Sequence, residues 1–106
     1  MRFVLAKDLP ADLARKLEGV KHTSAFALAE SDLRGGTHEE GMEYAQQSGA
    51  AYVTADEAWA GGIHAAEDHF GVVLVPREAP LEAVAAALLA LKTPEVNGRV
   101  VRLDLR

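Results

Sequence analysis

The sequence predicts a single α/β domain, spanning residues 1–106, with a mostly parallel central sheet of about five strands and helices on both faces, a three-layer sandwich. Two observations predict it. Short apolar runs alternate along the chain with segments in which apolar residues recur every three or four positions. The chain has 106 residues, 49 % of them hydrophobic, which is enough for one buried core and too little for two.

Five short apolar runs are the expected strands. They occupy residues 2–6, 23–29, 51–54, 72–75 and 99–105. The run at 72–75 is entirely apolar, which is typical of a strand buried on both faces. The run at 99–105 alternates apolar and charged residues, which is typical of a half-exposed edge strand.

The first two expected helices have clear start and stop signals. Asp8-Leu9-Pro10 opens the first, with the proline at or near the first helical position, and Gly19 ends it. Leu9, Leu13 and Leu17 form its apolar stripe. The T-x-x-E pattern from Thr37 to Glu40 is a capping box, which predicts a second helix running to about Ser48.

The later helices are predicted from periodicity and from helix breakers. Residues 55–70 read as one or two short helical pieces broken at Gly61 and Gly62. Apolar residues recur with the helical period over 81–91, with Pro80 at the start and Thr93-Pro94 at the end. The resulting order is βαβαβαβαβ.

Charge and composition exclude some classes of function. The formal net charge of −5 argues against a free-standing, non-specific binder of DNA or RNA, because such proteins carry a basic surface. It does not exclude a metal-dependent nuclease, because a bound divalent ion reverses the local field of an acidic site. The chain has no cysteine, so disulfides and thiolate zinc sites are excluded. No segment approaches the roughly 18 to 20 apolar residues of a membrane span, so we expect a cytoplasmic protein with no membrane partner.

Acidic residues follow the expected strands or begin the expected helices. Asp8 follows the first strand, Glu40 lies in the first turn of the second helix, and Asp56 follows the third strand. Carboxyl ends of parallel strands are where open α/β sheets bind ligands, and Mg²⁺ or Mn²⁺ prefers carboxylate oxygens. The spacing permits a shared ion site. Each acid also has a purely structural interpretation, since Asp56 is a natural N-cap and Glu40 belongs to the capping box.

Other polar residues give weaker signals. The hydroxyl of Thr54 could hold a water or a phosphate near Asp56, or simply end the strand. A helix would bring His64 and Asp68 to one face, but zinc needs three or four ligands, so we interpret this pair as surface. We expect Trp59 to pack in the core or at its rim. Three arginines give the last strand a basic character, which by default protects an edge; they are Arg99, Arg102 and Arg106.

Three segments in register resemble a known family. The segments are Leu5-Ala6-Lys7-Asp8-Leu9-Pro10, Leu33-Arg34-Gly35-Gly36-Thr37-His38-Glu39-Glu40 and Val53-Thr54-Ala55-Asp56-Glu57-Ala58-Trp59. They resemble L-D-E-N-L-P, L-R-G-x-x-D-E-E and V-T-x-D-x-D-F of the small PIN-like domains of prokaryotes, many of which resemble the toxin half of toxin–antitoxin pairs. The resemblance covers essentially the whole chain. It implies a PIN-like fold and Mg²⁺- or Mn²⁺-dependent cleavage of RNA.

The resemblance assigns the site residues and also shows where the site is eroded. It implies that Asp56, Glu40 and Asp8 hold the ion and activate water, and that Thr54 and Arg34 contact the substrate. The first-strand acids of the family are replaced by Ala6 and Lys7, and the second acid of the third segment is Ala58; these three positions carry no carboxylate.

Three interpretations of function follow. The first is a metal-dependent ribonuclease of toxin–antitoxin type, with an antitoxin-like protein partner and RNA as substrate. The second is a PIN-like module that has lost catalysis and binds a protein partner or RNA. The third, from fold class alone, is a small regulatory α/β domain, although the loss of the first-strand acids also argues against a phospho-acceptor site. The exposed last strand makes a homodimer plausible.

Overall fold

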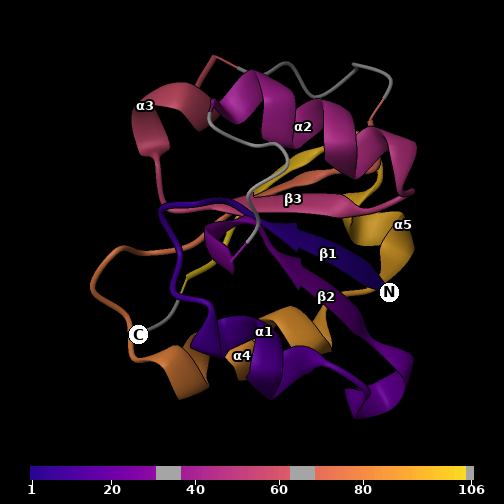
Figure 1. Cartoon of the computed structure of the whole chain (residues 1–106), viewed down its shortest axis with the longest axis vertical. Helices are drawn as coiled ribbons and strands as arrows, with labels where there is room; N and C mark the ends of the chain where they lie inside the picture. Colours follow the sequence, from indigo (N-terminus) through magenta and orange to yellow (C-terminus); the bar gives the residue numbers. More distant parts are fainter. Residues whose placement is uncertain (31–36, 63–68, 105–106) are drawn as a thin grey trace.

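The computed structural model describes residues 1–30, 37–62 and 69–104. Its centre is a five-stranded sheet in the order β2-β1-β3-β4-β5, in which every neighbouring pair is parallel (Figure 1). The strands are β1 Arg2–Leu5, β2 Ser24–Ala27, β3 Ala51–Thr54, β4 Val72–Leu74 and β5 Val100–Arg102. The predicted fold class is confirmed.

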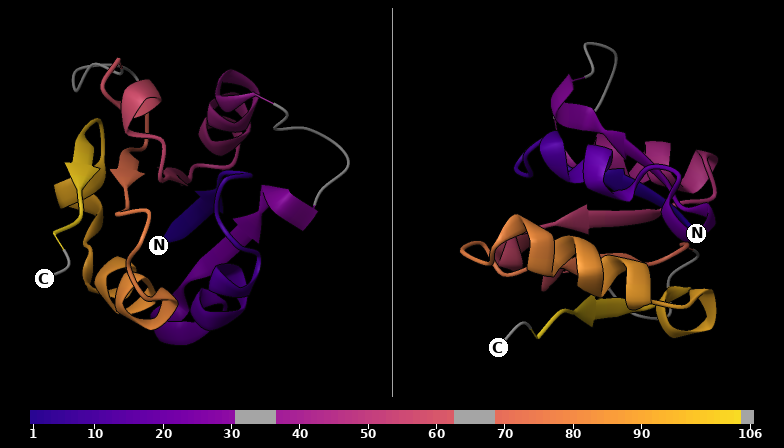
Figure 2. Two further views of the ribbon diagram at one scale, coloured as in Figure 1. Left: turned by 90° about the vertical axis from the view of Figure 1, so that its left-hand side faces the viewer. Right: turned by 90° about the horizontal axis from the view of Figure 1, so that it is seen from below.

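Helices cover both faces of this sheet. They are α1 Asp12–Leu17, α2 His38–Gln47, α3 Glu57–Ala60, α4 Leu81–Ala90 and α5 Thr93–Val96, with the 3₁₀ turns η1 Val20–His22 and η2 Leu28–Glu30. Helices α2 and α3 lie on one face, and α1 and α4 pack side by side on the other (Figure 2). None of the helices in the described part of the chain is long and apolar enough to cross a membrane.

The connection from β4 to β5 has the opposite hand to the other three. Helix α3, which lies between β3 and β4 in the chain, is on the same face of the sheet as α2. Helix α4, which lies between β4 and β5, is on the α1 face, although both connections run in the same direction across the sheet (Figure 2). Parallel crossovers are nearly always right-handed. Here the unusual hand places Val84 and Leu88 of α4 beneath Val53 and Val73, which α1 alone does not cover. Burial of this apolar surface favours the arrangement.

The strand register separates two cores. Leu5 lies beside Val53, and Val4 lies beside Tyr52, so alternate residues face opposite helix layers. The α1–α4 side is built from Leu, Val and Phe, as the predicted leucine stripe requires; Leu9, Leu13 and Leu17 are all buried in it. The α2 side is thinner and rich in alanine, with Tyr52 as its largest buried side chain.

The start of α1 agrees with the sequence prediction, and one later helix was not predicted. Pro10 lies just before α1, where its carbonyl accepts from the Leu13 amide, and the helix begins at Asp12. The segment after α4 was expected only to end that helix, yet it forms α5. The carboxylate of Glu95 accepts from the Lys92 amide at 2.9 Å. Four residues are too few to show a helical period, so this element had no periodic signal.

Gly41 allows α2 to approach the sheet closely. A Cβ atom added there would lie 2.7 Å from Cε1 and 2.8 Å from the hydroxyl oxygen of Tyr52, and 3.0 Å from Cδ1 of Leu28. Both neighbours are fully buried, so neither can move freely. The absence of a side chain at residue 41 therefore sets the distance between α2 and β3.

We expect Gly41→Ala to destabilise the fold. Alanine gains up to about 1 kcal/mol in helix propensity, but overpacking a rigid core costs about 1 to 3 kcal/mol, so the free energy of unfolding should fall. Urea denaturation measures it. Gly62→Ala is the matched control, because among the described residues its Cβ would meet the carbonyl of Trp59 alone, at an ordinary 3.5 Å. Equal stability of the Gly41→Ala variant and the wild type would contradict the packing argument.

Candidate functional site at the carboxyl edge of the sheet

The strand order fixes where a ligand site should lie. The chain leaves β1 towards β2 on one side and returns to β3 on the other, so the loops after β1 and β3 separate at their carboxyl ends. Such switch points are the usual ligand crevices of open α/β sheets, including those with this 2-1-3-4-5 order. Asp8 follows β1, and Thr54 and Asp56 end and follow β3. All three predicted residues therefore lie at this switch point.

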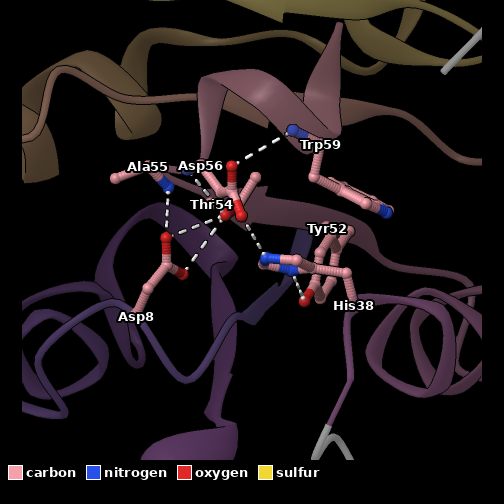
Figure 3. A network of polar contacts seen from close by, with 7 residues as sticks. All are labelled: Asp8, His38, Tyr52, Thr54, Ala55, Asp56 and Trp59. Atoms are coloured by element: carbon pink, nitrogen blue, oxygen red, sulfur yellow. Dashed lines mark hydrogen bonds and ion pairs between the residues drawn. The ribbon is translucent and has the colours of Figure 1, made fainter. Parts of the chain in front are cut away.

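Asp8 bridges the two loops. Its carboxylate accepts from the Thr54 hydroxyl at 2.9 Å and from the Ala55 amide at 2.9 Å (Figure 3). The Thr54 oxygen in turn accepts from the Asp56 amide at 3.0 Å. Thr54 is completely buried, so its hydroxyl depends on these partners. The Thr54 hydroxyl thus fixes the positions of both Asp8 and Asp56.

Asp56 is held through both of its carboxylate oxygens. Oδ1 accepts from the Trp59 amide at 3.1 Å, which makes Asp56 the N-cap of α3. Oδ2 lies 2.9 Å from Nε2 of His38, the first residue of α2. The hydrogen bond from the Trp59 amide and then that from His38, together with the positive charge of Arg77, hold the pKa of Asp56 below its ordinary value. Asp56 is therefore a carboxylate at neutral pH.

His38 connects Asp56 to the core. Its Nδ1 lies 2.9 Å from the Tyr52 hydroxyl, and its ring stacks on Trp59 with centroids 4.6 Å apart. Burial, and next the nearby Asp8, raise the pKa of Tyr52 far above its ordinary value, so the phenol keeps its proton. A carboxylate only accepts, so a neutral His38 donates from Nε2 to Asp56 and accepts at Nδ1 from Tyr52. Every polar atom in this chain of contacts then has a partner.

A cleft of about 440 Å³ opens beside Asp56 at the ends of β3, β4 and β5. Arg77 and Arg102 line it together with Asp56 and Glu57. The Arg102 guanidinium pairs with the Glu57 carboxylate at 2.6 Å, and both side chains are about two-thirds exposed. The cleft therefore offers positive charge next to a carboxylate, an arrangement suited to an anionic ligand.

The structure brings together some of the predicted site residues. Asp8, Thr54 and Asp56 form one network, whereas Glu40 is engaged at the start of α2. The Glu40 amide donates to the Thr37 hydroxyl at 3.2 Å, and its carboxylate accepts from the same hydroxyl at 3.3 Å. The structural interpretations of Asp56 as an N-cap and of Thr37 as the cap of α2 are confirmed. The predicted substrate residue Arg34 and the pair His64 and Asp68 lie outside the described residues.

The carboxylates at the carboxyl edge of the sheet suit a metal ion that keeps most of its coordinated water. Among residues 1–30, 37–62 and 69–104, no three histidine or acidic side chains converge on one point. Mg²⁺ does not require such a cage, because one or two carboxylates plus water and substrate phosphate suffice. Asp56 meets this requirement, since its side chain is ionised and 35 % exposed. Asp8 is a second carboxylate on the same threonine.

Sequence reasoning missed His38 and Tyr52 as parts of the site. The sequence places His38 only within the segment that carries the capping box, and Tyr52 only within the expected strand 51–54. The available signal was positional. The first residue of a helix that leads into β3 lies at the carboxyl edge of a parallel sheet, because helix and strand run in opposite directions. Arg77 was missed for the same reason, as it follows β4 at this edge.

Comparison with known proteins gives no further assignment. The chain matches no protein-family model, no curated protein and no solved structure. The site must therefore be interpreted from its own geometry.

The lowered pKa of Asp56 predicts how stability depends on pH. The folded state favours the carboxylate, so its stabilising contribution is complete above the ordinary pKa of 3.8 and is lost as pH falls through the lower folded value. Asparagine retains N-cap function without the charge. We therefore expect the stability difference between wild type and Asp56→Asn, measured by urea denaturation, to shrink between pH 6 and pH 3. A difference independent of pH would contradict this assignment.

Proposed function

We propose that the chain is a PIN-like domain of the toxin–antitoxin type that cleaves RNA with the help of Mg²⁺ or Mn²⁺ at the carboxyl edge of its sheet. The observation that carries the proposal is the convergence of Asp8, Thr54 and Asp56 at the switch point between β1 and β3. The resemblance of the three sequence segments that contain these residues and Glu40 supports the same conclusion.

The side chains at this edge have distinct roles in the proposal. Asp56 and Asp8 hold the ion, which when bound supplies a Lewis acid and an activated water. Thr54 keeps the two carboxylates in place through its hydroxyl. Arg77 and Arg102 in the adjacent cleft contact the substrate phosphate. Glu40 remains a predicted third ligand, with its carboxylate at the N-terminus of α2.

The electrostatics of the edge explain why a cation and the arginines belong together. Two carboxylates repel an RNA phosphate, and the chain as a whole carries a charge of −5. A divalent ion at Asp56 cancels this local repulsion. Arg77 lines the same cleft as Asp56, so its guanidinium can act on charge near that carboxylate. RNA binding in this proposal therefore depends on the metal.

Partners and location are part of the proposal. An antitoxin-like protein would neutralise the toxin by covering the acidic edge. The two outer strands, β2 and β5, form the edges of the sheet, at which a homodimer could form. A cytoplasmic location follows from the proposed action on RNA.

A second candidate is a PIN-like module that has lost catalysis and binds a protein partner or RNA. Two observations favour it. Ala6, at the position of the first acid of the family, is completely buried in the apolar α2-side core. Both oxygens of Asp56 already accept from protein groups, so an ion must compete with them. An RNase assay separates the two candidates.

We expect the purified protein to cleave single-stranded RNA in millimolar Mn²⁺, and Asp56→Ala to reduce the rate by about 100-fold or more, because a lost metal ligand removes several kcal/mol of transition-state stabilisation. Gel analysis of end-labelled RNA measures it. Glu82→Ala is the control, since Glu82 is an exposed acid on α4. Cleavage that survives chelator or Asp56→Ala would disprove the nuclease proposal. No cleavage by wild type would favour the inactive module.

We expect Ala6→Asp to report on a latent ion site. A carboxylate at this fully buried position costs several kcal/mol when no cation is present. In a PIN-like site, combined with Ala58→Asp, it should bind Mn²⁺ and recover stability, because the ion binds only the folded state. Thermal denaturation with and without Mn²⁺ measures this. The single Ala58→Asp variant is the control, as residue 58 is exposed. A double variant that gains nothing from Mn²⁺ would count against the PIN-like assignment.

A further inference from the structure

We propose that His38 is a ligand of the divalent ion, alongside Asp56, and that it makes the site select a later transition-metal ion such as Co²⁺ or Ni²⁺ over Mg²⁺. The inference rests on the proposed function in taking the ion to lie at Asp56. It adds a nitrogen ligand that the pattern of acids did not indicate.

The distance between the two side chains fits a shared ion. Nε2 of His38 and Oδ2 of Asp56 lie 2.9 Å apart. Two ligand atoms bound at about 2.1 Å and at right angles around one ion lie roughly 3 Å from each other. The pair therefore already has the separation of neighbouring ligands. Both side chains are partly exposed, His38 at 23 % and Asp56 at 35 %, so an ion and its waters can reach them.

Both side chains are oriented through the atoms that would not bind the ion. The Trp59 amide holds Oδ1 of Asp56, which leaves Oδ2 directed at His38. Tyr52 holds Nδ1 of His38, and the indole of Trp59 stacks on the imidazole. Metal-binding histidines are characteristically fixed by a partner on their other nitrogen. This outer arrangement is present here on both members of the pair (Figure 3).

Ion binding requires a change of tautomer at His38 and a rotation of the Tyr52 hydroxyl, whose proton then points away from Nδ1. Without an ion, Nε2 carries the proton that Asp56 accepts. With an ion on Nε2, the proton moves to Nδ1, which then donates to the Tyr52 oxygen 2.9 Å away. Because Tyr52 is buried and keeps its own proton, its oxygen remains a neutral acceptor.

The chemistry of the ligands decides which ion the site prefers. Imidazole nitrogen suits Mn²⁺ poorly to moderately and Co²⁺ and Ni²⁺ increasingly well, whereas Mg²⁺ takes oxygen ligands. One imidazole and one carboxylate, with the other positions filled by water or phosphate, therefore favour ions later in the transition series. An all-oxygen site at Asp8 and Asp56 would discriminate less between Mg²⁺ and Ni²⁺, because it lacks a nitrogen ligand.

Calorimetric titration of the full chain with MgCl₂, MnCl₂ and NiCl₂ tests the inference. We expect wild type to bind Ni²⁺ at least about tenfold more tightly than Mg²⁺. His38→Gln supplies an amide oxygen in place of nitrogen and should clearly reduce this preference, with little change for Mg²⁺. Asp56→Asn should weaken all three ions. A His38→Gln variant with the selectivity of wild type would overturn the inference.

Variants of two other histidines control for metal binding elsewhere in the chain. His22→Gln removes an exposed histidine outside the site, and His64→Gln removes one outside the described residues. Both should keep the selectivity of wild type. Loss of the Ni²⁺ preference in either variant, with retention in His38→Gln, would overturn the inference.

A measurement on wild type alone covers the case in which His38→Gln does not fold. Substoichiometric Mn²⁺ broadens nearby nuclear resonances, so imidazole signals of His38 should disappear before those of His22 and His69. Broadening that begins at another histidine would overturn the inference. The test distinguishes this inference from the proposed function. Metal selectivity that depends on His38, without RNA cleavage, would support the ligand pair and refute the nuclease. RNA cleavage with unchanged metal selectivity in His38→Gln would support the nuclease and refute the ligand pair.

Discussion

The site depends on one close contact, the packing of Gly41 in α2 against the ring of Tyr52 in β3. Because residue 41 has no side chain, α2 lies near enough to β3 for His38, one turn earlier, to contact both the Tyr52 hydroxyl and the Asp56 carboxylate. A larger residue would push the helix outward and separate these groups. Packing in the core therefore controls the geometry of a polar site at the surface.

The polar network has a part that holds the loops together and a part that can also bind an ion. The Thr54 hydroxyl and the Asp8 carboxylate join the loops after β1 and β3, and the buried hydroxyl depends on that bond. Asp56 and His38 are also paired, but both reach solvent and both can exchange their mutual hydrogen bond for a cation. The Asp8 carboxylate accepts from the buried Thr54 hydroxyl and is itself exposed, so it can hold this frame and also serve as the second carboxylate of the proposed ion site.

The two helix layers make unequal contributions. Large aliphatic side chains from α1 and α4 form most of the core, and the opposite hand of the β4-to-β5 connection is what places α4 there. The α2–α3 side is rich in alanine and brings its helices close to the strands. The thick side supplies most of the hydrophobic stabilisation, and the thin side lets helix ends reach the carboxyl edge, where the site lies.

The sequence by itself determined the fold class, the strands, the starts of α2 and α4 and the placing of Asp8, Thr54 and Asp56 at one edge. These follow from local periodicity, capping residues and the direction of parallel strands, all of which are properties of short segments. It could not determine α5, which is too short for a periodic signal, or the hand of the last connection. It also could not pair His38 with Asp56 and Tyr52. That pairing depends on how closely α2 packs on β3, which only the tertiary structure decides, because a helix–sheet distance is set by side chains far apart in the chain.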